Sequence, residues 1–188
     1  MTAPASPSDQ GAQTLWQACG LCCRGIWFSH AELQPNEVES ARRVGLKVEM
    51  QDAKPGFFQP CVMHKENRCS IYGDWRPGAC IEYSCALRDA YLADRTDLET
   101  ALMHVKTAKG MADRIQAETG HLAGVSQGKE FLSRLEGPLA HGDAAQTVLS
   151  SESRMDAVAL RVYFDRFFKS PDSATRVPGD DSPAPPAP

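Results

Sequence analysis

The stretch that decides the fold is the cysteine-bearing segment from residue 19 to residue 85. It opens with CGLCCR at residues 19–24 and closes with CSIYGDWRPGACIEYSC at residues 69–85, with a further thiol in Gln59-Pro60-Cys61 between them. The chain after residue 85 has no cysteine. So uneven a distribution indicates that the thiols act together. The seven are Cys19, Cys22, Cys23, Cys61, Cys69, Cys80 and Cys85.

The composition is typical of a soluble globular protein. Of 188 residues, 42% are hydrophobic and 23% are charged, and 20 basic against 24 acidic side chains give a net charge of −4. A chain without a basic stripe is not expected to bind nucleic acid, and no run approaches the ~20 apolar residues that cross a bilayer. The first residues, MTAPASPSDQGAQT, lack the basic and apolar regions of a secretory signal. We therefore predict a cytoplasmic protein that does not enter a membrane, in a compartment where thiols stay reduced or bind metals. A protein partner is left open.

The spacing of the cysteines favours metal binding. Cys19-x2-Cys22 lets two thiolates of one tight turn reach the same ion, and Gly20 relieves backbone crowding in that turn. A hairpin over residues 56–72 would bring Cys61 on its first arm beside Cys69 at the start of its second. Cys80 and Cys85 are five residues apart, which is about 140° around a helix, so one shared metal requires a bent segment between them.

The adjacent Cys22 and Cys23 present a geometric difficulty. Consecutive side chains diverge in a strand or a helix, so both are not expected to bind one ion. Either one is a ligand and the other is core, or the pair serves two metals or opposite sides of one cluster. Four thiolates complete an all-cysteine zinc site or a cubane cluster, and seven leave room for a second, incomplete site.

Basic side chains recur beside the cysteines. Four thiolates around a divalent ion carry a net charge of −2, which nearby cations would offset. Arg24, Arg68 and Arg76 each lie within four residues of a cysteine, although arginines are commonly solvated. His64 stands at Cys-x2-His spacing from Cys61, which zinc accepts, but a histidine at a hairpin turn is commonly solvated as well.

These motifs together resemble the zinc- or iron-chelating, cysteine-rich family called YkgJ-like, named for a CxxCxxCC cluster. The resemblance covers residues 16–88 and is carried by residues 19–24, by Gln59-Pro60-Cys61 and by the C-x-I-Y-x3-R-P-x2-C-x4-C pattern of residues 69–85. It implies a bound zinc or iron, with a [4Fe–4S] cluster as one form of the iron. Two departures are Trp16, where the family has its first cysteine, and the extra residue Trp75. Flagellin lysine-N-methylases carry a similar cluster, but this chain has no methyl-donor motif, so that activity is not inferred.

Several functions remain open at this level. The main hypothesis is a metal-binding adaptor or accessory module; the alternatives are a zinc- or iron–sulfur-dependent enzyme or redox protein, and a metal-handling protein. Structural disulfides would leave one of seven thiols unpaired, and a C-x2-C without a βαβ context is a weak thioredoxin signal. No triad, phosphate loop or dinucleotide fingerprint is present, so enzyme status is left open.

The expected fold is mainly α (α+β): a cysteine-rich, metal-bound N-terminal half with one small β-hairpin, packed on C-terminal helices. We predict disordered tails at 1–13 and 170–188, a cysteine-rich region at 14–87 and a helical region of the same domain at 88–169. Helical spacing predicts a short helix between Pro35 and Gly45, one after a capping box at residues 96–99, one at 129–136 and one at 153–168. The last is expected to bury a wide apolar face, made of Met155, Val158, Val162, Tyr163, Phe164, Phe167 and Phe168.

Overall fold

The fold is described by a computed structural model, in which residues 7–119 and 150–169 are placed. The helices are α1 (Pro7–Cys19), η1 (Pro35–Glu37), α2 (Val38–Arg43), α3 (Gly78–Glu82), α4 (Ala86–Leu92), α5 (Leu98–Thr119) and α7 (Ser151–Phe167). The strands are β1 (His30–Glu32), β2 (Glu49–Gln51), β3 (Lys54–Phe58), β4 (His64–Lys65) and β5 (Arg68–Cys69).

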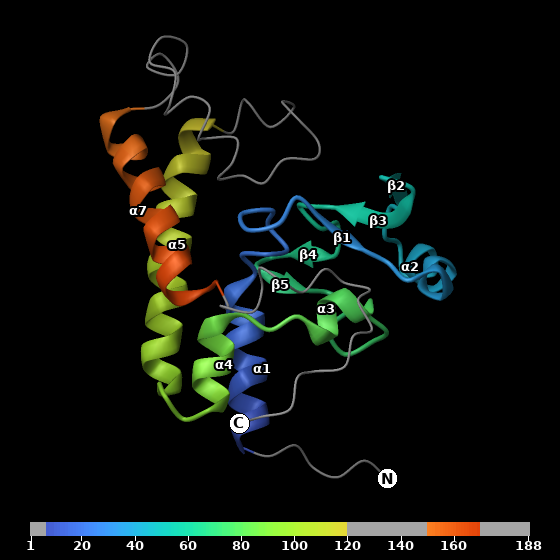
Figure 1. The fold of residues 1–188 in the computed structure, drawn as a ribbon, viewed down its shortest axis with the longest axis horizontal. Helices are drawn as coiled ribbons and strands as arrows, with labels where there is room; N and C mark the ends of the chain where they lie inside the picture. Colours follow the sequence, from blue (N-terminus) through green and yellow to red (C-terminus); the bar gives the residue numbers. More distant parts are fainter. Residues whose placement is uncertain (1–6, 120–149, 170–188) are drawn as a thin grey trace, which may run out of the picture.

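The molecule has a helical side and a strand-bearing side (Figure 1). The long helices α5 and α7 lie side by side, and α1 packs against both α5 and α4. On the other side are α2 and the three-stranded antiparallel sheet, ordered β1-β3-β2, with the two-stranded β4-β5 sheet nearer the helices. The cysteine-bearing segments therefore lie where the two sides meet.

The helical side contains the larger apolar core. Asp97 caps α5, because its Oδ1 accepts the Thr100 N–H at 2.7 Å. The helix predicted after residues 96–99 is thus confirmed. Its buried positions recur at helical spacing and meet buried side chains of α1, α4 and α7. They are Ala101, Val105, Ala108, Met111, Ala112 and Ile115.

The predicted last helix is confirmed as α7, but part of its predicted core face is wrong. Met155, Val158 and Val162 are 74%, 55% and 62% exposed. The buried face instead runs through Ser153, Ala157, Leu160, Phe164 and Phe168. These positions are three or four residues apart and meet α5 on one stripe, which leaves the three aliphatic side chains on the opposite face.

The single predicted hairpin is also wrong in detail, since the chain makes two sheets. Phe57 and Phe58 belong to β3, which pairs with β1 and β2, and only residues 64–69 form the small hairpin. Cys61 lies in the loop between them rather than on a strand, whereas Cys69 is on β5 as predicted. Pro60 favours this break, because it has no N–H to give to a ladder.

The predicted N-terminal tail is shorter than expected. Helix α1 begins at Pro7, so residues 7–13 are helical, because Ala12 and Leu15 are buried at 4% and 3% exposure and anchor the helix. The helix between Pro35 and Gly45 is confirmed as η1 followed by α2, ended by Gly45 at φ +94°. The predictions for residues 1–6, 129–136 and 170–188 fall outside the described residues.

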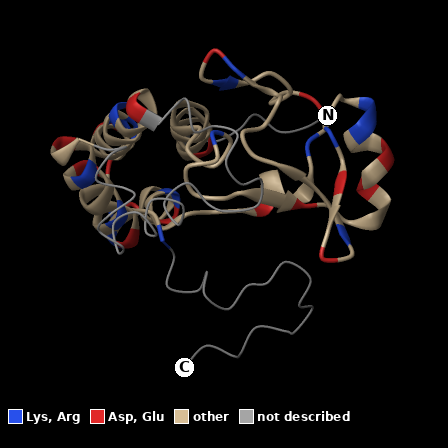
Figure 2. Ribbon diagram, turned by 90° about the horizontal axis from the view of Figure 1, so that it is seen from above, with Lys and Arg blue, Asp and Glu red and all other residues tan. Residues whose placement is uncertain are grey.

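A mainly helical fold with small antiparallel sheets is therefore confirmed. Figure 2 shows acidic and basic residues interspersed along the described helices. Within residues 7–119 and 150–169, none of the helices combines the length and the apolar character that crossing a membrane requires.

Candidate functional site

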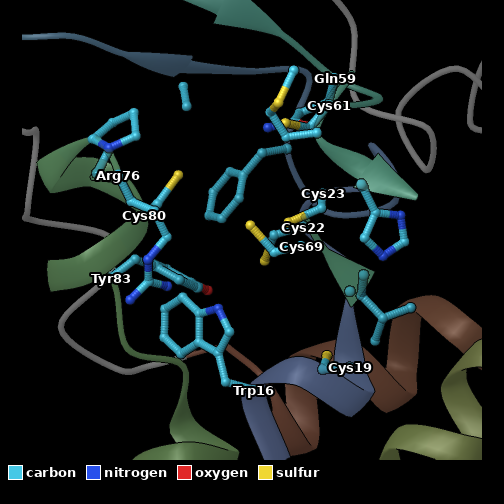
Figure 3. A pocket seen from close by; sticks show the side chains of 18 of the residues that line it. Trp16, Cys19, Cys22, Cys23, Gln59, Cys61, Cys69, Arg76, Cys80 and Tyr83 are labelled. Atoms are coloured by element: carbon cyan, nitrogen blue, oxygen red, sulfur yellow. The ribbon is translucent and has the colours of Figure 1, made fainter. Parts of the chain in front are cut away.

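A cavity of about 130 Å³ lies between the two sides of the molecule, and all seven cysteines line it. They come from the end of α1, the turn that follows, the loop before β4, strand β5, helix α3 and the start of α4. All seven are free thiols and all are partly buried. Figure 3 shows six of them around this space, with Cys19 at the end of α1 and Cys61 on the opposite wall. The structure thus brings together every cysteine that the sequence singled out.

The first three cysteines are placed by a tight turn. Helix α1 ends at Cys19, and Gly20 has φ +64°, a conformation that strongly favours glycine. The Ile26 N–H then donates to the Leu21 carbonyl at 3.0 Å, and both of these side chains are fully buried. Because the turn is anchored on both sides, its thiols keep fixed positions relative to the helical core.

The middle pair is placed by the small hairpin and the loop before it. The turn residues Glu66 and Asn67 have φ of 50° and 61°, the pattern of a two-residue hairpin turn. The hairpin sets His64 directly opposite Cys69. In the preceding loop the Cys61 N–H donates to the Cys23 carbonyl at 2.7 Å. This bond joins two cysteines that are 38 positions apart.

The last pair sits on two short helices with a break between them, as the spacing predicted. The carboxylate of Glu37 accepts the Gly78 N–H at 2.7 Å and so holds the start of α3, which carries Cys80. Tyr83 is extended, at φ −61° and ψ 129°, and ends α3. Cys85 then caps α4. The break turns both thiols toward one cavity, which a continuous helix would not allow.

Burial controls the ionisation of these thiols. Loss of solvent raises the pKa of Cys19, Cys23 and Cys80 to about 12, and it raises the pKa of Cys22 well above the ordinary value. Neighbouring thiols add to the shift, because each thiolate would repel the next. Such a cluster resists negative charge until a cation enters it.

The cations near the thiols are partly those that the sequence suggested. The charge of Arg76 offsets part of the burial-driven rise in the pKa of Cys80, and the Arg76 guanidinium stacks on Tyr72 at 4.0 Å. Arg24 instead pairs with Asp113 on α5 at 2.5 Å, although its charge still lowers the pKa of Cys19. Lys109, which the sequence gave no reason to select, also lowers that pKa.

Lys109 reaches the site from the middle of α5. Its Nζ donates to the Ala18 carbonyl at 2.9 Å, at the C-terminal end of α1. A cation there also complements the negative end of the helix dipole. Since this residue is 90 positions from Cys19 in the chain, only the packing of α5 on α1 brings it to the site. Arg68 is exposed on β5.

His64 is placed inside the site rather than at a solvated turn. Its Nε2 is buried, lines the cavity and has no hydrogen-bond partner among the described residues. The ring lies against the Cys19–Cys22 turn, because a Cβ added to Gly20 would come within 2.6 Å of that nitrogen. Burial, and then the charges of Lys109 and Arg24, lower the pKa of His64, so the imidazole is neutral. Its Cys-x2-His spacing was the sequence signal for this placement.

Aromatic side chains form the remaining wall of the cavity. Tyr83 meets Phe28 edge to face at 5.1 Å and Trp16 at 6.5 Å. Trp27 stacks on Phe164 of α7 at 4.7 Å and thereby ties the cysteine turn to the helical core. Trp16 thus fills wall space beside the thiols.

Across residues 7–119 and 150–169, no three His, Cys, Asp or Glu side chains stand in an arrangement that could hold a metal ion as they are positioned. The thiols surround a space without forming a ready coordination sphere. Rotation about χ1 moves a cysteine sulfur between staggered positions with no change in the backbone.

Comparison with known proteins does not assign the chain to a family. Neither a family model, nor a curated protein, nor a solved structure matches it. The resemblance to the YkgJ-like family therefore stays a prediction from the motifs alone.

Proposed function

We propose that this protein binds a thiophilic metal, zinc or iron, through the cysteines of the cavity, and acts as a metal-stabilised binding module. The observation that carries the proposal is the convergence of seven unpaired thiols from six segments on one space. Thiolate and imidazole donors suit zinc and iron and do not suit magnesium or calcium.

The donors of the cavity fit such a metal in charge as well as in softness. The thiols are neutral without a cation, because burial and mutual repulsion raise the pKa values of those such as Cys22 and Cys23. A divalent ion offsets the charge of the thiolates that bind it, and Arg76, Arg24 and Lys109 offset part of the rest. The orphaned nitrogen of His64 is an acceptor that a cation would satisfy. When bound, the metal supplies cross-links between segments that share little apolar core.

The separation of two apolar cores supports a stabilising role for the metal. Cys19 and Cys85 pack against the large helical core, whereas Cys61 and Cys80 pack against the small core of Leu33, Ala41, Leu46 and Phe57. Four buried residues stabilise a layer only weakly, since small cores bury little apolar area. We therefore expect the metal to hold the strand-bearing side in place and its removal to unfold that side first.

The test is metal analysis of full-length protein purified without oxygen, joined to a visible spectrum. Iron gives a brown protein that absorbs at about 400 nm, and zinc gives a colourless one. Removal of the metal with a chelator should then abolish hydrogen-exchange protection in β1–β3 while α5 and α7 stay protected. A well-folded protein that holds no ion after expression with zinc and iron present, and binds none on addition, would refute the proposal.

A second candidate function, metal-dependent chemistry on a small molecule, is favoured by the shape of the site. The aromatic wall of Trp16, Phe28 and Tyr83 faces the same cavity as the thiols, so an apolar ligand could lie beside the metal. This function requires an open coordination position. Binding of cyanide or azide to the cobalt-substituted protein, read as a shift of its visible bands, would support it. A spectrum unchanged by either anion would exclude it.

A further inference from the structure

The adjacent Cys22 and Cys23 have different surroundings, and this difference divides the seven thiols. Cys23 is joined through its carbonyl to the N–H of Cys61 at 2.7 Å, so it belongs beside the loop of the strand-bearing side. Cys22 follows the Gly20-Leu21 turn at the end of α1, and the Cys19-x2-Cys22 spacing lets these two thiols reach one ion. The two consecutive cysteines are therefore tied to different segments around one cavity.

The first group is Cys23, Cys61, Cys69 and Cys80. Cys61 and Cys80 both contact the small core of the strand-bearing side, and the backbone bond from Cys61 brings Cys23 to the same loop. Cys69 ends the β4-β5 hairpin on this side: the next N–H, that of Ser70, donates to the Met63 carbonyl at 2.9 Å, and Met63 packs on the same core. The group holds four thiols, which is the number that closes a tetrahedral site.

The second group is Cys19, Cys22 and Cys85. Cys19 and Cys85 both contact the large helical core, and Cys22 lies three residues after Cys19 in the turn that ends α1. This group holds only three thiols.

The second group has a fourth donor in His64. Its Nε2 is buried, faces the cavity without a partner among the described residues, and lies against Gly20 inside the Cys19–Cys22 turn. Lys109 lies beside the same turn, because its Nζ donates to the Ala18 carbonyl at 2.9 Å. His30 lines the same cavity, but its Nδ1 is occupied by the Ser29 hydroxyl at 3.1 Å.

We infer that the cavity is built for two metal ions rather than one: a four-thiolate site of Cys23, Cys61, Cys69 and Cys80, and a second site of Cys19, Cys22 and Cys85 completed by Nε2 of His64. The ligand class is a divalent, thiophilic ion, with Zn²⁺ as the reference case. Each thiol that binds releases its proton to solvent as the metal–sulfur bond forms, and the neutral imidazole releases none. The inference rests on the proposed function and specifies it.

The net charges of the two sites agree with their surroundings. A four-thiolate site around Zn²⁺ carries −2 and lies near Arg76, whose charge acts on Cys80. Three thiolates and a neutral imidazole around Zn²⁺ carry −1 and lie near Lys109 and Arg24. A His-containing site is also expected to differ from an all-thiolate one in the spectrum of its cobalt form, because sulfur and nitrogen ligands shift the visible bands differently.

The test is zinc and cobalt binding by the full-length, metal-free protein under reducing conditions. Wild type should bind two ions. Cys80→Ser and Cys85→Ser should each bind one, and the double variant none. His64→Ala should keep one ion at wild-type affinity and bind the other at least 10-fold more weakly, with loss of nitrogen-type cobalt bands, whereas the matched control His30→Ala should bind both ions as wild type does.

A measurement on wild type alone avoids variants that fail to fold. Thiols that bind no zinc are alkylated by N-ethylmaleimide, and intact-mass analysis counts the alkyl groups on each chain. After one equivalent of zinc, each chain should carry three labels if the four-thiolate site is filled, or four if the other site is filled. After two equivalents, chains should carry none. Saturation at one ion per chain would overturn the two-site assignment but leave metal binding intact. So would a mixture, after one equivalent of zinc, of chains with no label and chains with all seven. A wild-type chain that binds no ion and takes seven labels throughout would overturn the proposed function as well.

Discussion

Zinc binding by the metal-free protein should release about seven protons per chain at pH 7. The pKa of Cys19, Cys23 and Cys80 is about 12, so on the order of one such thiol in 10⁵ is ionised at that pH. A thiol at its ordinary pKa is also mostly protonated there, and only the thiolate binds the metal. Four protons should therefore leave when the four-thiolate site fills and three when the other site fills, since the lowered pKa of His64 leaves it without a proton to release.

Isothermal titration calorimetry in phosphate, MOPS and Tris measures this number. The observed enthalpy varies linearly with the ionisation enthalpy of the buffer, and the slope is the number of protons released. Cys85→Ser should lower the slope from about seven to about four. The apparent affinity of the four-thiolate site should also rise about 10⁴-fold per pH unit near neutrality. A wild-type slope of about one, or an affinity independent of pH, would refute the claim that the buried thiols are the ligands.

Four further predictions concern stability. Phe164→Ala should lower the free energy of unfolding by about 3–5 kcal/mol in urea titrations, because a fully buried ring is lost. The control Val162→Ala, at an exposed position of the same helix, should change it by less than about 0.5 kcal/mol. Equal losses in the two variants would contradict the packing of α7. Gly20→Ala should lower the free energy of unfolding by about 1 kcal/mol, because residue 20 has φ +64°. The added methyl group should also push the His64 ring aside, so that the protein binds one equivalent of zinc instead of two. An unchanged zinc stoichiometry would count against His64 as a ligand. The Asp156 carboxylate makes a two-point contact with an arginine of α5, at 2.6 and 2.8 Å, which lowers the pKa of Asp156. The contact therefore stabilises the folded protein fully at pH values above the ordinary carboxyl pKa. Asp156→Asn should lower the free energy of unfolding by about 0.5–1 kcal/mol at pH 7, and should not change it once the pH has fallen below the lowered pKa. The free energy of unfolding of the metal-free protein should stay constant up to about pH 9 and fall as the pH rises toward about 12. The reason is that the thiols ionise at a lower pH in the unfolded chain than in the folded protein. A free energy of unfolding that does not change over that range would contradict buried thiols.

Local rules predicted much of the helical framework. The capping-box pattern at residues 96–99 and the spacing of apolar residues after it predicted α5, although Asp97 rather than Thr96 caps the helix. Pro35 and Gly45 bracketed η1 and α2. These signals succeed because helix ends and periodicity depend on residues within a few positions of one another. The core face of α7 was mispredicted for a related reason. Large aliphatic side chains such as Val162 suggested burial, but the contact with α5 selects the stripe, and small residues such as Ala157 fit it.

The sheet arrangement depended on contacts that the local pattern does not record. Phe57 belongs to a strand, as predicted, but its partners are β1 and β2 rather than the segment that follows Cys61. Strand β1 lies more than twenty residues before β3, and single-sequence patterns carry no information about such distant pairing. Strand β2 is joined to β3 by the two-residue turn Asp52-Ala53, a local hairpin that the sequence analysis did not predict.

The sequence by itself determined which atoms are available for chemistry: seven thiols within one half of the chain, a histidine at ligand spacing, and a glycine at the turn that must accept a positive φ. It also determined that Cys80 and Cys85 can face one space only if the segment between them is bent, because helix geometry is independent of the rest of the fold. Only the tertiary structure decided which segments surround the thiols. The bond from Cys61 to Cys23, the two separate cores, and the approach of Lys109 and His64 to the first turn are contacts between distant segments, and such contacts are set by packing rather than by the order of residues along the chain.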